Sequence, residues 1–88
     1  MFKCTLVSAT DRREEQGLTG LFVQTVTGER GFLPGHVPLI ARLKANSLVR
    51  LKTGQGQKYY TVGADAFLQF GQNTAVILAR SFAETPGV

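Results

Sequence analysis

The stretch GERGFLPGHVPLI, residues 28–40, decides the fold of this chain. It holds two prolines, three glycines and the only histidine, with apolar residues between them. A regular internal strand cannot contain Pro34 and Pro38, because proline has no backbone N–H to donate to a neighbouring strand. An ordinary surface loop would be more polar. We therefore predict a shaped, partly buried turn over residues 28–38 that joins two strands, with Gly35 at a positive φ.

On both sides of this turn, short apolar segments alternate with turn residues. Strands are expected at residues 2–8, 18–27, 39–43, 47–52, 57–62, 66–70 and 74–80, and a bulge at Gly20. Residues 74–80 are nearly all apolar, which predicts burial on both faces of that strand. Residues 11–17 are charged and are expected to form a loop or a strand edge. Such spacing of strands and turns is typical of a β-sandwich or barrel, so the predicted fold class is all-β.

The size of the chain fits one domain. It has 88 residues, 43% of them hydrophobic, and a net charge of +4. We expect a sandwich domain over residues 1–82 and a short tail over residues 83–88, where no periodic pattern is present. The modest positive charge favours a negatively charged partner but identifies none.

The sequence offers few residues for catalysis or metal binding. With one cysteine, Cys4, and one histidine, His36, an internal disulfide or a three- to four-ligand zinc site is excluded. No serine elbow or convergent pair of carboxylates is present. The glycines of residues 54–56 precede a strand instead of a helix, so they predict a hairpin turn and not a phosphate loop. We expect no catalytic residue, no metal site and no cofactor.

The longest apolar run, residues 75–79, is far shorter than the roughly 20 residues of a membrane helix. The N-terminus leads directly into a strand pattern and shows no secretory signal. We therefore expect a soluble, cytoplasmic chain that reaches a membrane only through partners.

Nucleic-acid binding is an alternative function. Basic and aromatic residues lie together on the predicted hairpin of residues 47–62: Arg50, Lys52, Lys58, Tyr59 and Tyr60. Such residues on a sheet are the components of a small domain that binds single-stranded nucleic acid. This alternative gains support if Lys58, Tyr59 and Tyr60 are exposed together on one face. An unrelated interaction domain is a further alternative.

The pattern Gly-x-x-Gly-apolar-apolar-Pro-Gly-His-x-Pro-Leu, residues 28–39, resembles the N-terminal domain of the epsilon subunit of F-type ATP synthases. The resemblance runs from the first strand, residues 6–9, to the last, residues 74–79, and the spacing from the first strand to Pro34-Gly35-His36 fits the family without a gap. It implies a sandwich of about ten strands in two sheets, with no active site and no cofactor of its own. It also implies a place at the foot of the central stalk, peripheral to the cytoplasmic side of the inner membrane, where the domain couples c-ring rotation to the γ subunit.

The resemblance further implies which residues meet the two partners. The flank that faces γ corresponds to Ser8, His36 and Ala41, and the lower loop that faces the c-ring corresponds to Gly28, Glu29, Arg30 and Gly31. The resemblance implies that the domain neither inserts into a membrane nor binds nucleic acid. For single residues simpler roles remain open, because Glu29 could be a solvated turn acid, Ser8 could bond its own loop, and His36 could be a turn residue.

Three departures from the family pattern stand out. The usual subunit continues into a C-terminal hairpin of two helices, whereas this chain ends at Val88; if it is complete, regulation through that hairpin is expected to be absent. Ala64 stands where a second glycine is common. Residues 11–16 are more charged than is usual, which affects how the second strand pairs.

Overall fold

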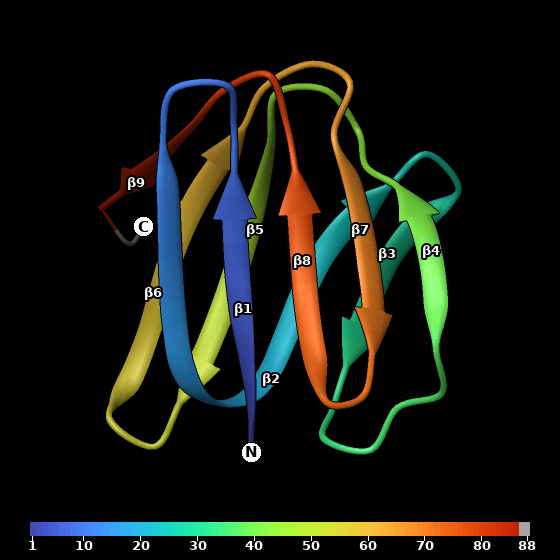
Figure 1. Ribbon diagram of the computed structural model, residues 1–88, viewed down its shortest axis with the longest axis vertical. Helices are drawn as coiled ribbons and strands as arrows, with labels where there is room; N and C mark the ends of the chain where they lie inside the picture. Colours follow the sequence, from blue (N-terminus) through green and yellow to red (C-terminus); the bar gives the residue numbers. More distant parts are fainter. Residues whose placement is uncertain (87–88) are drawn as a thin grey trace.

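The computed structural model describes residues 1–86 and contains nine β-strands within them (Figure 1). The strands are β1 (Phe2–Val7), β2 (Arg12–Thr25), β3 (Gly28–Phe32), β4 (Leu39–Arg42), β5 (Ser47–Thr53), β6 (Gly56–Val62), β7 (Phe67–Gly71), β8 (Thr74–Leu78) and β9 (Phe82–Thr85). The prediction of an all-β fold is confirmed. No helix of residues 1–86 is long and apolar enough to span a membrane.

Hydrogen bonds join the nine strands into one continuous sheet, in the order β4-β7-β8-β1-β2-β5-β6-β9, with β3 added to β2. The long strand β2 makes the link, since its first half pairs with β1 and its second half pairs with β5 and β3. In Figure 1, β2 turns at the bottom of the view and passes behind β8, so the sheet folds over on itself. The expected count of two separate sheets is therefore not confirmed.

The fold in β2 has a local cause. Gly17 adopts a φ of 72°, and the register with β5 shifts between Leu18 and Gly20. A glycine at positive φ and an irregular register bend a strand without ending it. The bulge predicted at Gly20 is confirmed, and the charged residues 12–17 form a strand continuous with it.

A single hydrophobic core lies between the two halves of the folded sheet. Leu6 and Ile77 contribute from β1 and β8, and Leu21 and Leu51 from β2 and β5, all at most 1% exposed. The predicted burial of the last apolar strand on both faces is wrong, because Leu78 on β8 is 51% exposed. The described chain covers the inner face of β8 but places no element over its outer face.

The glycine- and proline-rich stretch contains a strand and a shorter turn than predicted. Residues 28–32 form β3, which pairs with β2 through a hairpin whose turn lies at residues 26–27. The expected loop over Gly28–Gly31 is therefore wrong: these residues are a strand, because the chain has already reversed direction before Gly28. Only residues 33–38 form the connection to β4.

A type II β-turn shapes this connection. The backbone N–H of His36 donates to the carbonyl oxygen of Leu33 at 3.1 Å, and Gly35 has a φ of 83°. Pro34 and Gly35 occupy the two central positions, which is the preferred arrangement for this turn. Asn73 accepts a hydrogen bond from the Gly35 N–H at 3.0 Å, which fixes the turn against the β7–β8 hairpin. The positive φ predicted at Gly35 is confirmed.

We expect Gly35→Val to lower the free energy of unfolding by about 1–3 kcal/mol, because a β-branched residue is strained at this positive φ. A Cβ at Gly35 would meet no atom within 4 Å, so strain is the only cause. Gly54→Val is the matched control: Gly54 also has open space, in an exposed turn without a positive φ. Urea unfolding of both variants measures the difference, and equal midpoints would contradict the prediction.

The chain continues as a strand beyond residue 82, within the stretch we expected to be a tail. β9 pairs antiparallel with β6, so that Tyr59 lies opposite Thr85 and Val62 opposite Phe82. The hydroxyl oxygens of Thr61 and Thr85 are 2.8 Å apart. The sequence shows no apolar alternation here because β9 is held by backbone pairing, a few polar contacts and one apolar residue, Phe82, which packs on Tyr60. Residues 87 and 88 of the expected tail lie outside the described residues.

Candidate partner-binding surface

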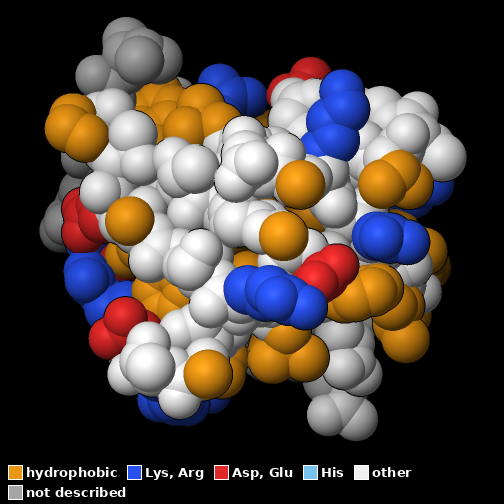
Figure 2. Space-filling model, turned by 90° about the horizontal axis from the view of Figure 1, so that it is seen from above, with side chains coloured by type: hydrophobic (Ala, Val, Ile, Leu, Met, Phe, Trp, Pro, Cys, Tyr) orange, Lys and Arg blue, Asp and Glu red, His pale blue; other side chains and the backbone are white. Residues whose placement is uncertain are grey.

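An exposed hydrophobic surface covers the outer side of β4, β7 and β8. Phe67 on β7 lies between Arg42 of β4 and Leu78 of β8 in the strand register. Phe67 is 44% exposed, Leu78 51% and Ile40 of β4 70%. Figure 2, a view from above, shows hydrophobic side chains gathered at the lower right, with single basic and acidic side chains between them. We call Ile40, Phe67, Val76 and Leu78 the outer hydrophobic face.

A groove continues this face toward the turn of residues 33–38. It has a volume of about 470 Å³ and is lined by Pro38, Gln69, Phe70, Gly71, Gln72, Thr74 and Val76. Val76 and Gln69 are opposite one another in the β7–β8 register, so the groove begins where the outer hydrophobic face ends. Clustered apolar residues beside a concave region are typical of a surface that another protein covers.

His36 is half-buried at the end of this layer. Its ring lies 4.8 Å from the Phe32 ring and 5.8 Å from the Phe70 ring, both edge-on. Nδ1 is 2.7 Å from the carbonyl oxygen of Val37, which requires a proton on Nδ1. His36 is therefore a turn residue that caps an aromatic cluster, and its remaining ring edge is accessible to a partner.

Ser8 and Ala41 occupy other margins of the same layer. The Ser8 hydroxyl accepts hydrogen bonds from the backbone N–H groups of Thr10 and Asp11, at 3.3 and 3.1 Å, so it stabilises the β1–β2 loop. Ala41 lies on the edge strand β4, opposite the buried Leu68 of β7, and is half-buried.

The three predicted γ-facing residues do not converge on one point. Ser8 follows the upper end of β1, Ala41 lies on the edge strand β4, and the loop that holds His36 is at the lower end (Figure 1). They border the layer of β1, β8, β7 and β4 on three sides. The outer hydrophobic face, which sequence reasoning missed, lies between them. In the sequence, this face is marked by the nearly continuous apolar run of residues 75–79, which predicts a strand buried on both faces.

The predicted ring-facing residues lie on β3. Glu29 and Arg30 are both exposed, and successive residues of a strand direct their side chains to opposite faces. Glu29 lines a depression of about 320 Å³ with Phe22 and Arg50, whereas Arg30 lines a cavity next to β4. The packing explains why residue 31 is a glycine, because a Cβ there would lie 3.0 Å from the Phe22 ring. The four residues therefore do not form one contiguous patch.

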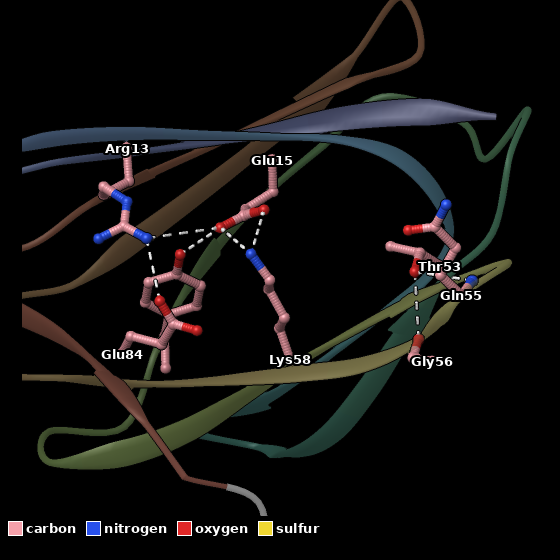
Figure 3. Close-up of polar contacts among 8 residues, drawn as sticks. Arg13, Glu15, Thr53, Gln55, Gly56, Lys58 and Glu84 are labelled. Carbon is pink, nitrogen blue, oxygen red and sulfur yellow. Dashed lines mark hydrogen bonds and ion pairs between the residues drawn. The ribbon is translucent and has the colours of Figure 1, made fainter.

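A polar cluster links β2, β6 and β9 at another site (Figure 3). The hydroxyl of the buried Tyr60 donates a hydrogen bond to the Glu15 carboxylate, and Lys58 Nζ lies 3.2 Å from the same carboxylate. Arg13 approaches Glu15 at 4.0 Å and Glu84 of β9 at 2.9 Å. Sequence reasoning missed this cluster, because Glu15 and Tyr60 are 45 residues apart and meet only through the sheet.

This cluster changes the acidity of two of its members. Partial burial alone would raise the pKa of Glu15, but hydrogen bonds from Tyr60 and Lys58 and the charges of Lys58 and Arg13 lower it below its ordinary value. Burial and the adjacent carboxylate raise the pKa of Tyr60 above its usual range. Glu15 is thus an anion and Tyr60 a neutral donor at neutral pH.

We expect Glu15→Gln to cost about 1–2 kcal/mol of unfolding free energy at pH 7, because it removes a charged hydrogen-bond acceptor from the buried Tyr60. A folded-state pKa below the unfolded value of about 4.5 means that the charge stabilises above that pH, and that this stabilisation is lost as the pH falls through the folded pKa. Urea unfolding should therefore show that the difference in unfolding free energy between the unmodified protein and Glu15→Gln becomes smaller from pH 7 to pH 3.

Glu14→Gln is the matched control, because Glu14 is an adjacent acid whose side chain, among residues 1–86, makes polar contacts only with Arg12 and Gln16. It should follow the unmodified protein at every pH. A gap between Glu15→Gln and the unmodified protein that stays constant down to pH 3 would contradict the assignment.

The polar cluster also bears on the nucleic-acid alternative. Tyr60 is fully buried, and Lys58 forms an ion pair with Glu15. Tyr59, one residue along, lies opposite Arg50 on the other face of the sheet. The condition for that alternative, exposure of Lys58, Tyr59 and Tyr60 on one face, is not met.

Within residues 1–86, no three His, Cys, Asp or Glu side chains lie close enough to hold a metal ion. Cys4 is buried, and burial, with a smaller effect from the Glu15 charge, raises the pKa of its thiol to about 12. A neutral thiol without solvent access is unreactive, as expected for a cysteine on an inward-facing strand position.

Comparison with known protein families gives one match over almost the whole chain. Residues 1–85 fit the model of the β-sandwich domain of the ATP synthase delta/epsilon chain. The ATP synthase epsilon chain of Mycobacterium avium is 38% identical over 77 residues, which are 85% of this chain and 63% of that protein. The epsilon chain of Pediococcus pentosaceus is 41% identical over 66 residues, covering 75% and 46% of the two chains. This chain thus spans less than two-thirds of the length of these relatives.

Solved structures share the fold. A chain in the Euglena gracilis mitochondrial ATP synthase structure, described as OSCP/F1/c-ring, matches with a TM-score of 0.81 and 18% identity, over 92% of this chain and 51% of that one. A chain in the Tetrahymena thermophila ATP synthase central stalk and c-ring structure has a TM-score of 0.72 and 11% identity, over 93% and 65%. At these identities the likeness concerns the fold alone.

Proposed function

The chain belongs to the family of ATP synthase delta and epsilon chain β-sandwich domains, and we propose from this premise that it is the β-sandwich part of an epsilon subunit. In this role it binds the γ subunit and the c-ring and transmits rotation between them during ATP synthesis driven by an ion gradient. It is not itself catalytic, since the nucleotide chemistry belongs to other subunits. It lies on the cytoplasmic side of the inner membrane, held there by the complex.

The observation that carries the contact with γ is the outer hydrophobic face. Three of its side chains, Ile40, Phe67 and Leu78, are 44–70% exposed although each is large and apolar. Burying such side chains against a partner removes apolar area from water, at about 25 cal/mol per Å². Ser8, His36 and Ala41 border this face, so γ would cover the layer of β1, β8, β7 and β4 and reach these residues at its margins.

The contact with the c-ring is proposed to use the exposed edge of β3 over Gly28–Gly31, with Glu29 as its principal residue and Arg30, on the opposite face, at its margin. Glu29 is exposed and forms no ion pair with residues 1–86. A carboxylate that is free to accept hydrogen bonds suits ring loops that carry arginine or amide groups.

Binding to a purified γ subunit from the same source tests the proposed function, by calorimetry or co-elution, with single-stranded DNA as a parallel ligand. We expect one-to-one binding to γ and none to DNA. Absence of γ binding at micromolar concentration would overturn the proposal and leave the family likeness as one of fold. Binding to DNA instead would restore the nucleic-acid alternative.

We expect Glu29→Gln and Glu29→Ala to weaken binding of the assembled γ complex to the c-ring by about tenfold, because each removes a charge-assisted hydrogen bond. The melting temperature should stay unchanged, since Glu29 is exposed. Glu14→Gln, an acid on β2, is the matched control and should leave ring binding unaffected. Two readouts test this: the coupling of ion pumping and co-sedimentation with the ring. If both remained unchanged in both Glu29 variants, Glu29 would be excluded from the contact.

A further inference from the structure

Two strand edges remain unpaired where the folded sheet nearly closes. Within residues 1–86, β3 pairs only with β2 and β4 pairs only with β7, so each has one free edge. At one end β4 is joined to the end of β2 and its turn, because Val26 N–H donates to the Arg42 carbonyl at 3.2 Å and Lys44 N–H donates to the Gln24 carbonyl at 2.8 Å. Beyond this bridge, β3 and β4 do not pair.

The backbone of β4 is suited to receive a strand there. Arg42 and Lys44 direct backbone groups away from β7, toward the end of β2 and its turn, and in an antiparallel sheet every second residue points to the same side. Ile40 therefore directs its N–H and its carbonyl into the gap, and Arg42 directs its N–H there too. An unpaired edge of this kind is the site at which extended peptides add to a sheet.

The gap is also an open cavity with a distinct chemical character. Its volume is about 220 Å³, and all four residues of β4 line it together with the turn of residues 25–27 and Arg30. Val26 and Ile40 are 58% and 70% exposed. Arg30 and Arg42 are exposed, and among residues 1–86 neither they nor Arg50 has a carboxylate within 4.0 Å, whereas Arg12 and Arg80 each have one and Arg13 has two.

We propose that the gap between β3 and β4 binds an extended acidic segment of a partner protein, which adds as a strand to the free edge of β4. Arg30 and Arg42, which have no acidic partners among residues 1–86, would pair with carboxylates of the bound segment. The exposed side chains of Val26 and Ile40 would pack against its apolar residues. Ile40 and Arg42 are two residues apart on β4 and share one face, so the segment should carry an apolar and an acidic residue two positions apart. The gap shares Ile40 with the proposed γ contact and Arg30 with the proposed c-ring contact. The inference nevertheless concerns a different interaction, the addition of an acidic segment to the backbone edge of β4.

The test uses a capped, fluorescein-labelled peptide of eight residues, Glu-Glu-Val-Val repeated twice, as the probe, so that each face of the added strand presents both kinds of side chain. Fluorescence anisotropy measures its affinity for the whole chain, and the amide signals of Ile40 and Arg42 in ¹⁵N spectra report where it binds. We expect saturable binding that weakens with salt and shifts both amide signals. A peptide with lysine in place of glutamate should bind at least tenfold more weakly.

Variants separate the proposed site from general electrostatic attraction. Combining Arg30→Glu with Arg42→Glu should weaken binding at least tenfold. Lys3→Glu with Lys52→Glu changes the net charge equally at exposed positions away from the gap and should change the affinity less than twofold. If a variant unfolds, as judged by its spectrum, the milder pair Arg30→Gln with Arg42→Gln replaces it, with a loss of at least threefold expected.

Five results would overturn the proposal. Three are no binding at millimolar peptide, equal affinity in the two double variants, and shifts confined to another edge such as β9. Sedimentation showing that the chain dimerises through β4, or an oligonucleotide that competes for Ile40 and Arg42, would assign the gap to a different occupant and would likewise overturn it. Failure here leaves the γ-binding test unaffected, because that test relies on the outer hydrophobic face.

Discussion

Phe67→Asp is expected to weaken binding of the γ subunit by about a hundredfold or more while the fold remains intact. Phe67 is the central residue of the outer hydrophobic face, between Arg42 and Leu78. A central aromatic residue of an interface commonly contributes 2–4 kcal/mol when truncated, and each 1.4 kcal/mol is a factor of ten in affinity. The aspartate adds a carboxylate that binding would bury. Calorimetric titration with γ measures the change.

Leu48→Asp is the matched control for this experiment. Leu48 is also an exposed hydrophobic residue, at 38%, but it lies on β5 in the other half of the folded sheet. It should bind γ with unchanged affinity. Equal losses in both variants would indicate a general effect of charge or of stability, and no loss in Phe67→Asp would exclude the outer hydrophobic face as the γ contact.

Phe32→Ala is expected to lower the free energy of unfolding by about 3–5 kcal/mol, the range for truncating a buried aromatic residue. Phe32 is fully buried, with its ring stacked 5.5 Å from Phe70 and the His36 ring edge-on at 4.8 Å. Small domains are stable by only about 5–15 kcal/mol, so this loss removes a large part of the total. Urea and thermal unfolding both measure it.

Phe22→Ala supplies the comparison. Phe22 is half-buried on the outer side of β2, where the Arg50 guanidinium lies 4.3 Å from its ring centre. Phe22→Ala should lower the free energy of unfolding by about 1 kcal/mol, because one face of the Phe22 ring is already near solvent. If Phe22→Ala were as destabilising as Phe32→Ala, the core would not lie where the structure has it. Phe32→Leu, which keeps most of the volume, should recover more than half of the lost stability.

Local patterns allowed much of the fold to be predicted. The hairpin at residues 53–56, the bulge at Gly20 and the positive φ of Gly35 each depend on residues next to one another in the chain, where glycine and proline restrict the backbone directly. The strands they separate followed from alternation. Family resemblance then supplied the sandwich architecture, which periodicity alone could not distinguish from a barrel.

Features that depend on distant pairing were not predictable. Residues 28–31 look like a loop because of their two glycines, yet they form β3, since β2 is long enough to pair with them. β9 has no apolar alternation and is held by backbone bonds to β6. The exposure of Leu78 could not be read from an apolar run, because a strand that faces a partner protein has the same composition as one buried on both sides.

The measurement that tests the central claim most directly is a titration of the ¹⁵N-labelled chain with unlabelled γ subunit, followed through its backbone amide signals. The account predicts that signals of β4, β7 and β8 shift or broaden at a one-to-one ratio, together with those of Ser8 and His36 at the margins. Signals of β5 and β6 should stay in place. Changes centred on β5 and β6, or no changes at micromolar γ, would contradict the account.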